Sequence, residues 1–485
     1  MTKACAAATP PPASAGPFSQ FSRYDALGLA KLVRARQVTP KDLFEDAIRK
    51  IEALNPKLNA VICKTYDRAL RQCKSAMAYD GLFAGVPFLV KDNATIAGVA
   101  STLGSRSMVG SISERTASFF TATERAGFVL LGVTNMPEMG LIDGTENVLY
   151  GPTHNPWNLA YSPGGSSGGS GACVAAGILP LAHGTDGGGS IRIPASHCGL
   201  FGLKASRGRL LPGSFANASW PRLVEGGLSR TVRDTAAYFS ATEDPGTPLP
   251  KLGFVSRKSP TRLKIAIMFD GMQGQTPHPD VRKAIVDAAE LCRDLGHTIG
   301  EARPPFDQSA LSDAARQVAA VDVANAVGAI ARARGIVRLE DGFESRALGL
   351  REQALRKGPF DGQIAAALPI LKAGTAALDR FFQQWDILLS PVLRAPVFKT
   401  GMRDQAKFSF RELDDMLHDY VAYTSLHNIC GTPAMSVPLH WDSNGMPLGS
   451  QFAARTGAEA TLLALAYELE EARPWATRNP PTFVT

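Results

Sequence analysis

The sequence lacks the features of a disulfide-rich secreted protein and of a membrane protein. Its 485 residues include seven cysteines, an odd number, and no Cys-x-x-Cys pair. Disulfide frameworks and zinc sites need paired cysteines, so neither is expected, and a reducing cytoplasm is the default location. No apolar run reaches the roughly 18 residues of a membrane span, so no membrane partner is expected.

Clustered charge and a secretory leader are also missing. Lys and Arg outnumber Asp and Glu by 51 to 44, which gives a net charge of +7. These basic residues form no stripe that could follow a nucleic-acid backbone, so we expect no nucleic-acid partner. Residues 1–20 are rich in Ala, Pro and Ser and lack the apolar core of a signal peptide, which predicts a disordered tail.

What the chain does contain is a series of short apolar runs with helical sequence between them. The runs have strand length and lie at 86–90, 128–133, 263–268, 386–389 and 434–437. Strands that alternate with helices predict an α/β fold with a buried sheet covered by helices on both faces. No clean linker appears, so we expect one large domain over residues 21–485.

Helix boundaries can be read at several points. Thr39 is a cap with Pro40 at the first helical position and Asp42 three residues after the cap, and we expect this helix to end near Asn55-Pro56. Residues 278–295 carry an apolar face, and Gly296 should stop that helix. Residues 300–380 are Ala-rich and mainly helical in pattern.

A glycine- and serine-rich tract over residues 162–192 is the strongest candidate for chemistry. Gly/Ser tracts are usually flexible linkers, but here apolar residues interrupt the tract and Gly187-Gly188-Gly189-Ser190 runs into Ile191-Arg192. Successive glycines let backbone N–H groups converge on an anion. The tract has no GK[ST] phosphate-loop ending, so an oxyanion is favoured over a phosphate, with Ser190 as the nucleophile.

A serine nucleophile needs a base, and three residues are candidates. His183 and His197 flank the loop, but the G-x-S-x-G elbow that accompanies Ser-His catalysis in α/β-hydrolases is absent around Ser190. Lys91 follows the apolar run 85–90, and burial can lower the pKa of a lysine by about 3–5 units, so that a neutral amine accepts a proton. Spacing alone leaves the choice open.

Several motifs resemble the amidase signature family, the Ser-cisSer-Lys amidases. The most specific is Pro-Gly-Gly-Ser-Ser-Gly-Gly-Ser (163–170) followed by Gly-Thr-Asp-Gly-Gly-Gly-Ser-Ile-Arg (184–192). Further matches are Gly-Val-Pro-Phe-Leu-Val-Lys-Asp (85–92), Cys-Gly-Leu-Phe-Gly-Leu-Lys (198–204) and Gly-Met-Pro-Leu-Gly-Ser-Gln (445–451). The resemblance covers nearly the whole chain after residue 20. It implies a single domain with a central mixed β-sheet.

The resemblance also implies regions within that domain. They are N-terminal helices at about 24–75, a catalytic core at about 80–240, a helical specificity region at about 300–380, and the C-terminal part of the core at about 384–472. Substrate specificity is expected in residues 208–225 and 309–360, which match no motif.

Site roles follow from the resemblance residue by residue. Ser190 would form the acyl-enzyme, Ser166 (after a cis peptide bond) would relay its proton, and Lys91 would be the neutral base. The oxyanion hole would consist of backbone N–H groups of Ser190 and the glycines before it, and one further glycine would line the acyl pocket. These glycines are Gly187, Gly188, Gly189 and Gly140. Asp186 and Arg192 would form a structural pair that shapes the loop.

The expected substrate is a small amide, an aryl amide or an oligoamide, and the stretch Phe88–Arg209 and the ending Pro474-Trp475-Ala476 resemble bacterial amidases such as the 6-aminohexanoate cyclic dimer hydrolases. No cofactor and no metal are implied, and an exposed apolar helix face would suit a homodimer. An alternative is the A subunit of glutamyl-tRNA amidotransferase. Those subunits usually carry Asp-Gln-x-Gly-Pro after the nucleophile, where this chain has Leu-Val-Glu-Gly-Gly-Leu-Ser-Arg (223–230). A relative that only binds is disfavoured because Lys91, Ser166 and Ser190 are all present.

Overall fold

Two β-sheets organise the chain in the computed structural model, which describes residues 21–75, 79–213 and 218–484. The larger has eight strands in the order β4-β6-β5-β10-β11-β9-β7-β8, and the smaller has the order β1-β3-β2. The strands are β1 (Val61–Lys64), β2 (Pro87–Lys91), β3 (Val129–Thr134), β4 (Leu181–Asp186), β5 (Phe201–Lys204), β6 (Val224–Ser229), β7 (Lys264–Ile267), β8 (Thr298–Glu301), β9 (Ile387–Pro391), β10 (Ala434–Trp441) and β11 (Pro447–Ala454). The predicted tail, residues 1–20, lies outside the described residues.

The larger sheet is mixed, which confirms the predicted α/β class. β7 pairs in parallel with β8 and β9, whereas β4, β5, β6, β10 and β11 pair antiparallel. This is the expected central sheet, and the three-stranded sheet is an addition that the sequence did not indicate; the two sheets meet where β2 packs against β4. At this seam the backbone N–H of Lys91 donates to Nδ1 of His183 at 3.2 Å, so a side chain helps to join the two sheets.

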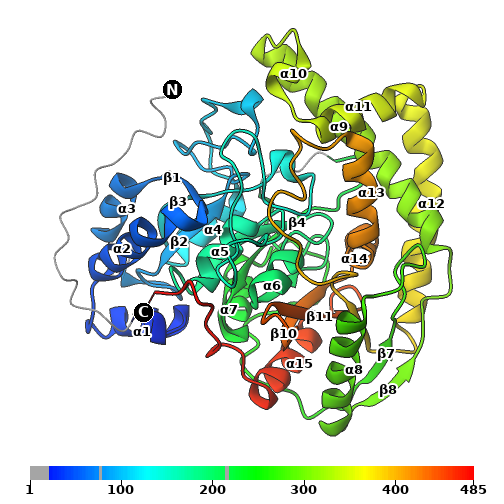
Figure 1. Ribbon diagram of the computed structural model, residues 1–485. Helices are drawn as coiled ribbons and strands as arrows, with labels where there is room; N and C mark the ends of the chain where they lie inside the picture. Colours follow the sequence, from blue (N-terminus) through cyan, green and yellow to red (C-terminus); the bar gives the residue numbers. More distant parts are fainter. Residues whose placement is uncertain (1–20, 76–78, 214–217, 485) are drawn as a thin grey trace.

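Helices cover the sheets, and Figure 1 shows them gathered in groups. Helices α1 to α3 lie around the small sheet, and α9 to α13 lie together on the opposite side of the molecule (Figure 1). The helices are α1 (Ala26–Arg34), α2 (Pro40–Leu58), α3 (Tyr66–Cys73), α4 (Ser118–Arg125), α5 (Gly168–Ala175), α6 (Arg192–Cys198), α7 (Val232–Thr242), α8 (Pro279–Asp294), α9 (Gln308–Arg334), α10 (Leu339–Gly342), α11 (Ser345–Arg356), α12 (Phe360–Phe381), α13 (Phe410–Tyr420), α14 (Ser425–Cys430) and α15 (Glu459–Ala472). No helix in the described ranges has both the length and the apolar character needed to cross a bilayer.

The predicted capping signals are confirmed, with one error at a helix end. Thr39 and Asp42 form the reciprocal capping box of α2, and α8 ends just before Gly296. However, α2 continues through Pro56 to Leu58, because Asn59 adopts a left-handed conformation and closes the helix by donating to the carbonyl of Asn55. A proline in the last turn removes one donor without breaking the helix.

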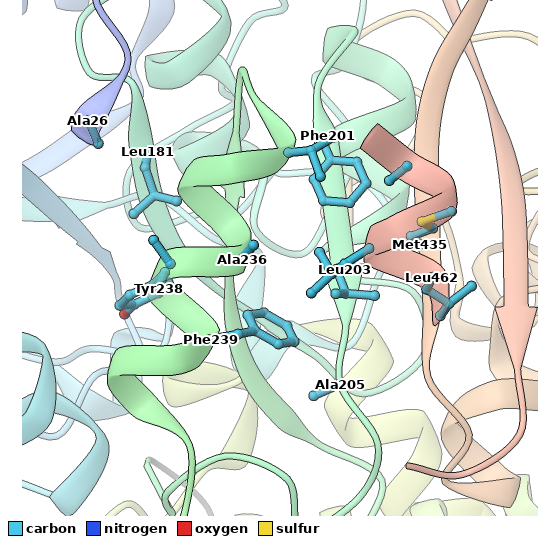
Figure 2. Packing of buried hydrophobic residues seen from close by; sticks show 14 of the residues in the cluster. Ala26, Leu181, Phe201, Leu203, Ala205, Ala236, Tyr238, Phe239, Met435 and Leu462 are labelled. Carbon is cyan, nitrogen blue, oxygen red and sulfur yellow. The ribbon is translucent and has the colours of Figure 1, made fainter. Parts of the chain in front are cut away.

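The largest hydrophobic core lies where α7 packs on the larger sheet. Figure 2 shows Phe239 of α7 pointing toward Leu203 of β5, whereas Tyr238 points to the other side of the helix, where its ring lies 5.6 Å from that of Phe88 in β2. Phe201, Leu203, Tyr238 and Phe239 are all fully buried. Burial of an aromatic or leucine side chain is worth about 1.5–3 kcal/mol. This packing fixes β5, β6 and their neighbour β4, the strand that leads into the glycine loop before Ser190.

The glycines of α5 permit close packing of this helix at the seam. A Cβ atom at Gly169 would lie 2.6 Å from the backbone N and O of Asn135, a distance that no side chain could tolerate. Every residue of α5 is buried, and the helix packs against α6, β2 and β4. The tract that composition alone would describe as a linker is therefore one of the most tightly packed parts of the molecule.

Candidate active site

A cavity of about 380 Å³ collects the side chains that the sequence predicts to react. Lys91 comes from the end of β2, Ser166 from the segment just before α5, and Ser190 from the loop between β4 and α6. Gly140, Gly187 and Gly188 also line the cavity. Three chain segments far apart in sequence thus bring one amine and two hydroxyls to the same space.

Lys91 lines this cavity, and its side chain is buried and hydrogen-bonded. Its side chain is 1% exposed, and Nζ lies 2.6 Å from Ser166 Oγ and 3.0 Å from Thr185 Oγ1. Burial lowers the pKa of Lys91 to about 7, although the negative charges of Asp186 and Glu225 oppose the shift. A large fraction of Lys91 is therefore neutral near pH 7 and can accept a proton from Ser166.

Ser166 is held against Gly140. The peptide bond between Gly165 and Ser166 is cis, as the family resemblance implies. Gly140 has a φ of +69°, and a Cβ atom there would lie 3.1 Å from Ser166 Oγ. The left-handed backbone conformation at this position favours glycine, and so does the lack of room for a side chain next to the Ser166 hydroxyl.

The Ser190 side chain makes no hydrogen bond with any described residue, and it faces the cavity. Its carbonyl accepts from the N–H of Ser167 at 3.2 Å, which ties the nucleophile loop to the segment that carries Ser166. The Lys91–Ser166 arm of the expected relay is therefore formed as a hydrogen bond. The Ser166–Ser190 arm is not formed as a hydrogen bond in this structure.

The glycine loop provides fewer open donors than predicted. The N–H of Gly189 donates to Asp186 Oδ1 at 2.8 Å, so Gly189 supports the loop and its expected role as an oxyanion donor is not supported by the geometry. Among described residues the N–H groups of Gly187, Gly188 and Ser190 have no partner, and all three residues line the cavity. Three backbone donors thus remain for an oxyanion.

A buried ion pair holds this loop in place, as predicted for Asp186 and Arg192. Arg192 Nε and Nη2 each donate to the carboxylate at 2.9 Å, and both side chains are inaccessible to solvent. Burial alone would raise the pKa of Asp186, but the attraction of Arg192 outweighs it, and the carboxylate stays charged. Arg192 also reaches C-terminal residues: Gln451 Oε1 at 2.7 Å, Asn428 Oδ1 at 2.6 Å and the Thr424 carbonyl at 2.9 Å.

Replacing Arg192 with methionine is expected to destabilise the protein strongly. The change leaves Asp186 buried without its cation, and breaking a buried ion pair from one side costs about 3–5 kcal/mol. Urea denaturation measures the free energy of unfolding. Arg356→Met removes an exposed pair with Glu352 and should cost about 0–1 kcal/mol, so equal effects of the two variants would contradict this role.

Neither histidine near the loop reaches the cavity. His183 accepts the Lys91 N–H at Nδ1, and its Nε2 lies 2.7 Å from Glu225 Oε2. His197 lies 2.9 Å from the Tyr420 hydroxyl, and burial lowers its pKa to about 4. Both imidazoles are buried and occupied by structural contacts, so of the three candidate bases only Lys91 lines the cavity with Ser190.

The remaining walls of the cavity come from Leu103, from residues 136–143 and from four further stretches. Two of them, 208–225 and 309–360, are the stretches that the sequence suggested for specificity, and they contribute residues such as Trp220, Leu223 and Val323. Residues 272–275 and 414–429 complete the walls, and no motif in the sequence marks them. Within the described part of the chain no cluster of His, Cys, Asp or Glu could hold a metal ion.

Comparisons with known proteins give matches over most of the chain. A family model described as Amidase matches residues 42–463. The 6-aminohexanoate-cyclic-dimer hydrolase of Paenarthrobacter ureafaciens is 35% identical over 483 residues, which cover 94% of this chain and 96% of that protein. A solved structure of 6-aminohexanoate cyclic dimer hydrolase complexed with substrate has a TM-score of 0.84 and 33% identity, covering 95% and 99% of the two chains.

A bacterial aryl acylamidase of the amidase signature enzymes has a comparable solved structure. Its TM-score is 0.83 with 29% identity, and the match covers 93% of this chain and 97% of that one.

Proposed function

The chain belongs to the amidase family, and from this premise we propose that it hydrolyses a carboxylic amide through an acyl-enzyme on Ser190, with Ser166 and Lys91 relaying the proton. The observation that carries the proposal is the 2.6 Å contact between Lys91 Nζ and Ser166 Oγ in a cavity that Ser190 also lines. Burial of Lys91 supplies a neutral amine at this point. A serine nucleophile is weak without such a base.

In the first step Ser190 Oγ attacks the amide carbonyl carbon. The proton of Ser190 passes to Ser166 Oγ while the proton of Ser166 passes to Lys91 Nζ, which becomes an ammonium. A turn of the Ser190 side chain toward Ser166 is needed, since the two hydroxyls are not hydrogen-bonded in this structure. Catalytic hydrogen bonds of a free enzyme often form only when substrate binds.

The tetrahedral intermediate carries a negative oxygen, which the N–H groups of Gly187, Gly188 and Ser190 would bind. One oxyanion donor typically lowers a barrier by about 2.7–4 kcal/mol. Collapse of the intermediate breaks the carbon–nitrogen bond, and the Lys91 ammonium returns its proton through Ser166 to the leaving amine. Water then attacks the ester by the same relay, releasing the carboxylic acid and restoring Ser190.

The cavity favours a substrate with apolar groups around the amide. Its walls include Leu103, Met136, Trp220 and Val323, and burial of such surface on a substrate is favourable. The relatives above are named for an aryl acylamide and for a cyclic oligoamide. A small amide, an aryl amide or an oligoamide is therefore the class we propose.

Trapping of the acyl-enzyme tests the proposal. Purified protein is incubated with aryl amides, primary amides, cyclic amides, linear oligoamides and free glutamine, then quenched in acid and analysed by mass spectrometry. We expect a mass increase equal to the acyl group, located on the peptide that contains Ser190. Hydrolysis without any label at Ser190, or a label on another residue, would contradict the nucleophile assignment.

The same panel tests the amidotransferase alternative. Release of ammonia from glutamine, together with partner subunits that co-purify, would favour the A subunit of a glutamyl-tRNA amidotransferase. Turnover of aryl or oligomeric amides by the isolated chain would favour the amidase proposed above.

A further inference from the structure

Arg222 is a charged residue of the active-site cavity that the proposed mechanism does not use. It stands two residues before β6 and lines the cavity with Trp220 and Leu223. Among the described residues its guanidinium forms neither a hydrogen bond nor an ion pair. A guanidinium has five N–H donors in a planar fork, so a whole set of donors is open to a ligand.

No acidic side chain of the described residues forms a direct ion pair with Arg222. Asp322 attracts it electrostatically, but Asp322 Oδ1 is occupied by the hydroxyl of Ser219 at 2.6 Å and by the Ser219 N–H at 3.2 Å. A second cation, Arg207, lies near enough to be repelled by Arg222 and packs over the ring of Trp220. Burial lowers the pKa of Arg222, and the attraction of Asp322 opposes this shift only in part.

The other arginines of the cavity differ because they already have acidic partners. Arg316 Nη2 donates to Asp414 Oδ2 at 2.7 Å, and Arg346 Nη1 donates to Asp414 Oδ1 at 2.8 Å. The remaining cavity acid, Asp143, is paired with Arg403 through both carboxylate oxygens. Of the arginines that line the cavity, Arg222 is therefore the one without a partner inside the described ranges.

Arg222 is also held close to the reacting groups. Its carbonyl accepts from Asn428 Nδ2 at 3.3 Å, and the same nitrogen lies 2.9 Å from Asp186 Oδ1, so one side chain ties Arg222 to the nucleophile loop. The next residue, Leu223, has its Cα 3.9 Å from the point that a Cβ at Gly187 would occupy. Consecutive Cα atoms lie about 3.8 Å apart, which places the Arg222 backbone within about 8 Å of that point.

We propose that Arg222 binds a carboxylate of the substrate, so that the preferred substrates are amides carrying a carboxylate a short aliphatic chain away from the scissile bond. This inference rests on the proposed amide hydrolysis at Ser190. A planar guanidinium fork matches a carboxylate with two parallel hydrogen bonds. The apolar side chains of Leu223 and Trp220 beside Arg222 suit the methylene groups between the two functions.

The test compares anionic amides with neutral amides of the same shape. One pair places the carboxylate on the acyl part: the mono-anilide of glutaric acid against the anilide of hexanoic acid. The other places it on the amine part: N-hexanoyl-6-aminohexanoate against N-heptyl hexanamide. We expect kcat/KM to be about 10- to 100-fold higher for the anionic member of one pair, because a charge-assisted hydrogen bond contributes a free energy of that size. The pair that shows the preference identifies the side of the amide that faces Arg222.

Substitution of Arg222 should remove this preference. In Arg222→Gln the ratio of kcat/KM between anionic and neutral substrates should fall at least about tenfold, mainly through KM, and Arg222→Lys should restore part of it. Arg316→Gln removes a cavity arginine that already has a partner and should keep the ratio. Circular dichroism and turnover of the neutral amide show that each variant is folded.

Two outcomes would overturn the inference: equal kcat/KM within both pairs for the unmodified enzyme, or a preference that Arg222→Gln retains. Failure of the underlying function looks different, because no amide would then acylate Ser190. Turnover of neutral and anionic amides at equal rates through Ser190 would reject the carboxylate site and leave the amidase mechanism standing.

Discussion

Replacing Ser190 with alanine is expected to lower kcat by about 10⁴- to 10⁶-fold, because loss of a nucleophile removes the covalent route and leaves only binding and oxyanion stabilisation. Ser190 is partly exposed to the cavity and its hydroxyl holds no other group, so the fold should be unaffected. The measurement is steady-state hydrolysis of an amide from the panel, with circular dichroism and urea denaturation to check the fold.

Ser312→Ala is the matched control for this experiment. Ser312 lies on α9 and lines the same cavity, but the proposed mechanism gives it no role. We expect its kcat to change less than about tenfold, since it contributes only to the wall. If Ser190→Ala kept a tenth of the original rate, Ser190 could not be the residue that is acylated.

Replacing Lys91 with methionine is the second large effect, an expected loss of about 10²- to 10⁴-fold in kcat, the usual contribution of a general base. Methionine keeps the length of the side chain, so the buried site stays filled, but it cannot accept the proton from Ser166. Lys50→Met is the control, because Lys50 is also fully buried and its pKa is also lowered by burial. Lys50 pairs with Asp46 on α2 and does not line the cavity, so its loss should affect stability rather than kcat.

The pH profile provides an independent test of Lys91. Because the base must be neutral and burial lowers its pKa to about 7, kcat/KM should be constant above pH 7 and fall about tenfold per pH unit below it. The residual activity of Lys91→Met should lack this dependence. A profile that is flat between pH 5 and pH 8, or one that Lys91→Met retains, would transfer the role of base to another group.

Combined substitutions reveal whether Ser190 and Lys91 act in one chain of proton transfer. If they do, the double variant Ser190→Ala/Lys91→Met should be no slower than Ser190→Ala alone, because a relay without a nucleophile has nothing to transfer. Additive losses would mean that Lys91 also acts in a step that does not involve Ser190.

Much of the architecture could be predicted because local sequence patterns indicate the strands and helices. The apolar runs at 86–90, 128–133 and 434–437 became β2, β3 and β10, and the Thr39 cap began α2. Strands β4 and β6 were missed, since Leu-Ala-His-Gly-Thr-Asp and Val-Glu-Gly-Gly-Leu-Ser contain glycine and polar residues. They are strands because both are buried and pair with each other along their whole length, which is a tertiary effect.

The site shows the same division between local and tertiary signals. The glycine loop, Ser166 and Lys91 were predicted from motifs, and the structure brings them to one cavity. The occupied N–H of Gly189 could not be foreseen, because it depends on where the Asp186 carboxylate points after Arg192 draws it into the core. Residues 414–429 line the cavity without a motif, because only the folding of the chain returns them to the loop.

The residues that hold the nucleophile loop in place, Thr424 and Gln451, follow it at a long distance in the sequence. The active site can therefore form only after these later residues have folded. Thr424 Oγ1 donates to the Gly188 carbonyl at 2.6 Å, and Gln451 accepts from Arg192. An N-terminal fragment that stops before these residues would contain every reacting side chain but not the braces that fix the oxyanion donors. During synthesis on the ribosome, activity can therefore appear only after residues 424 and 451 have emerged and folded against the loop.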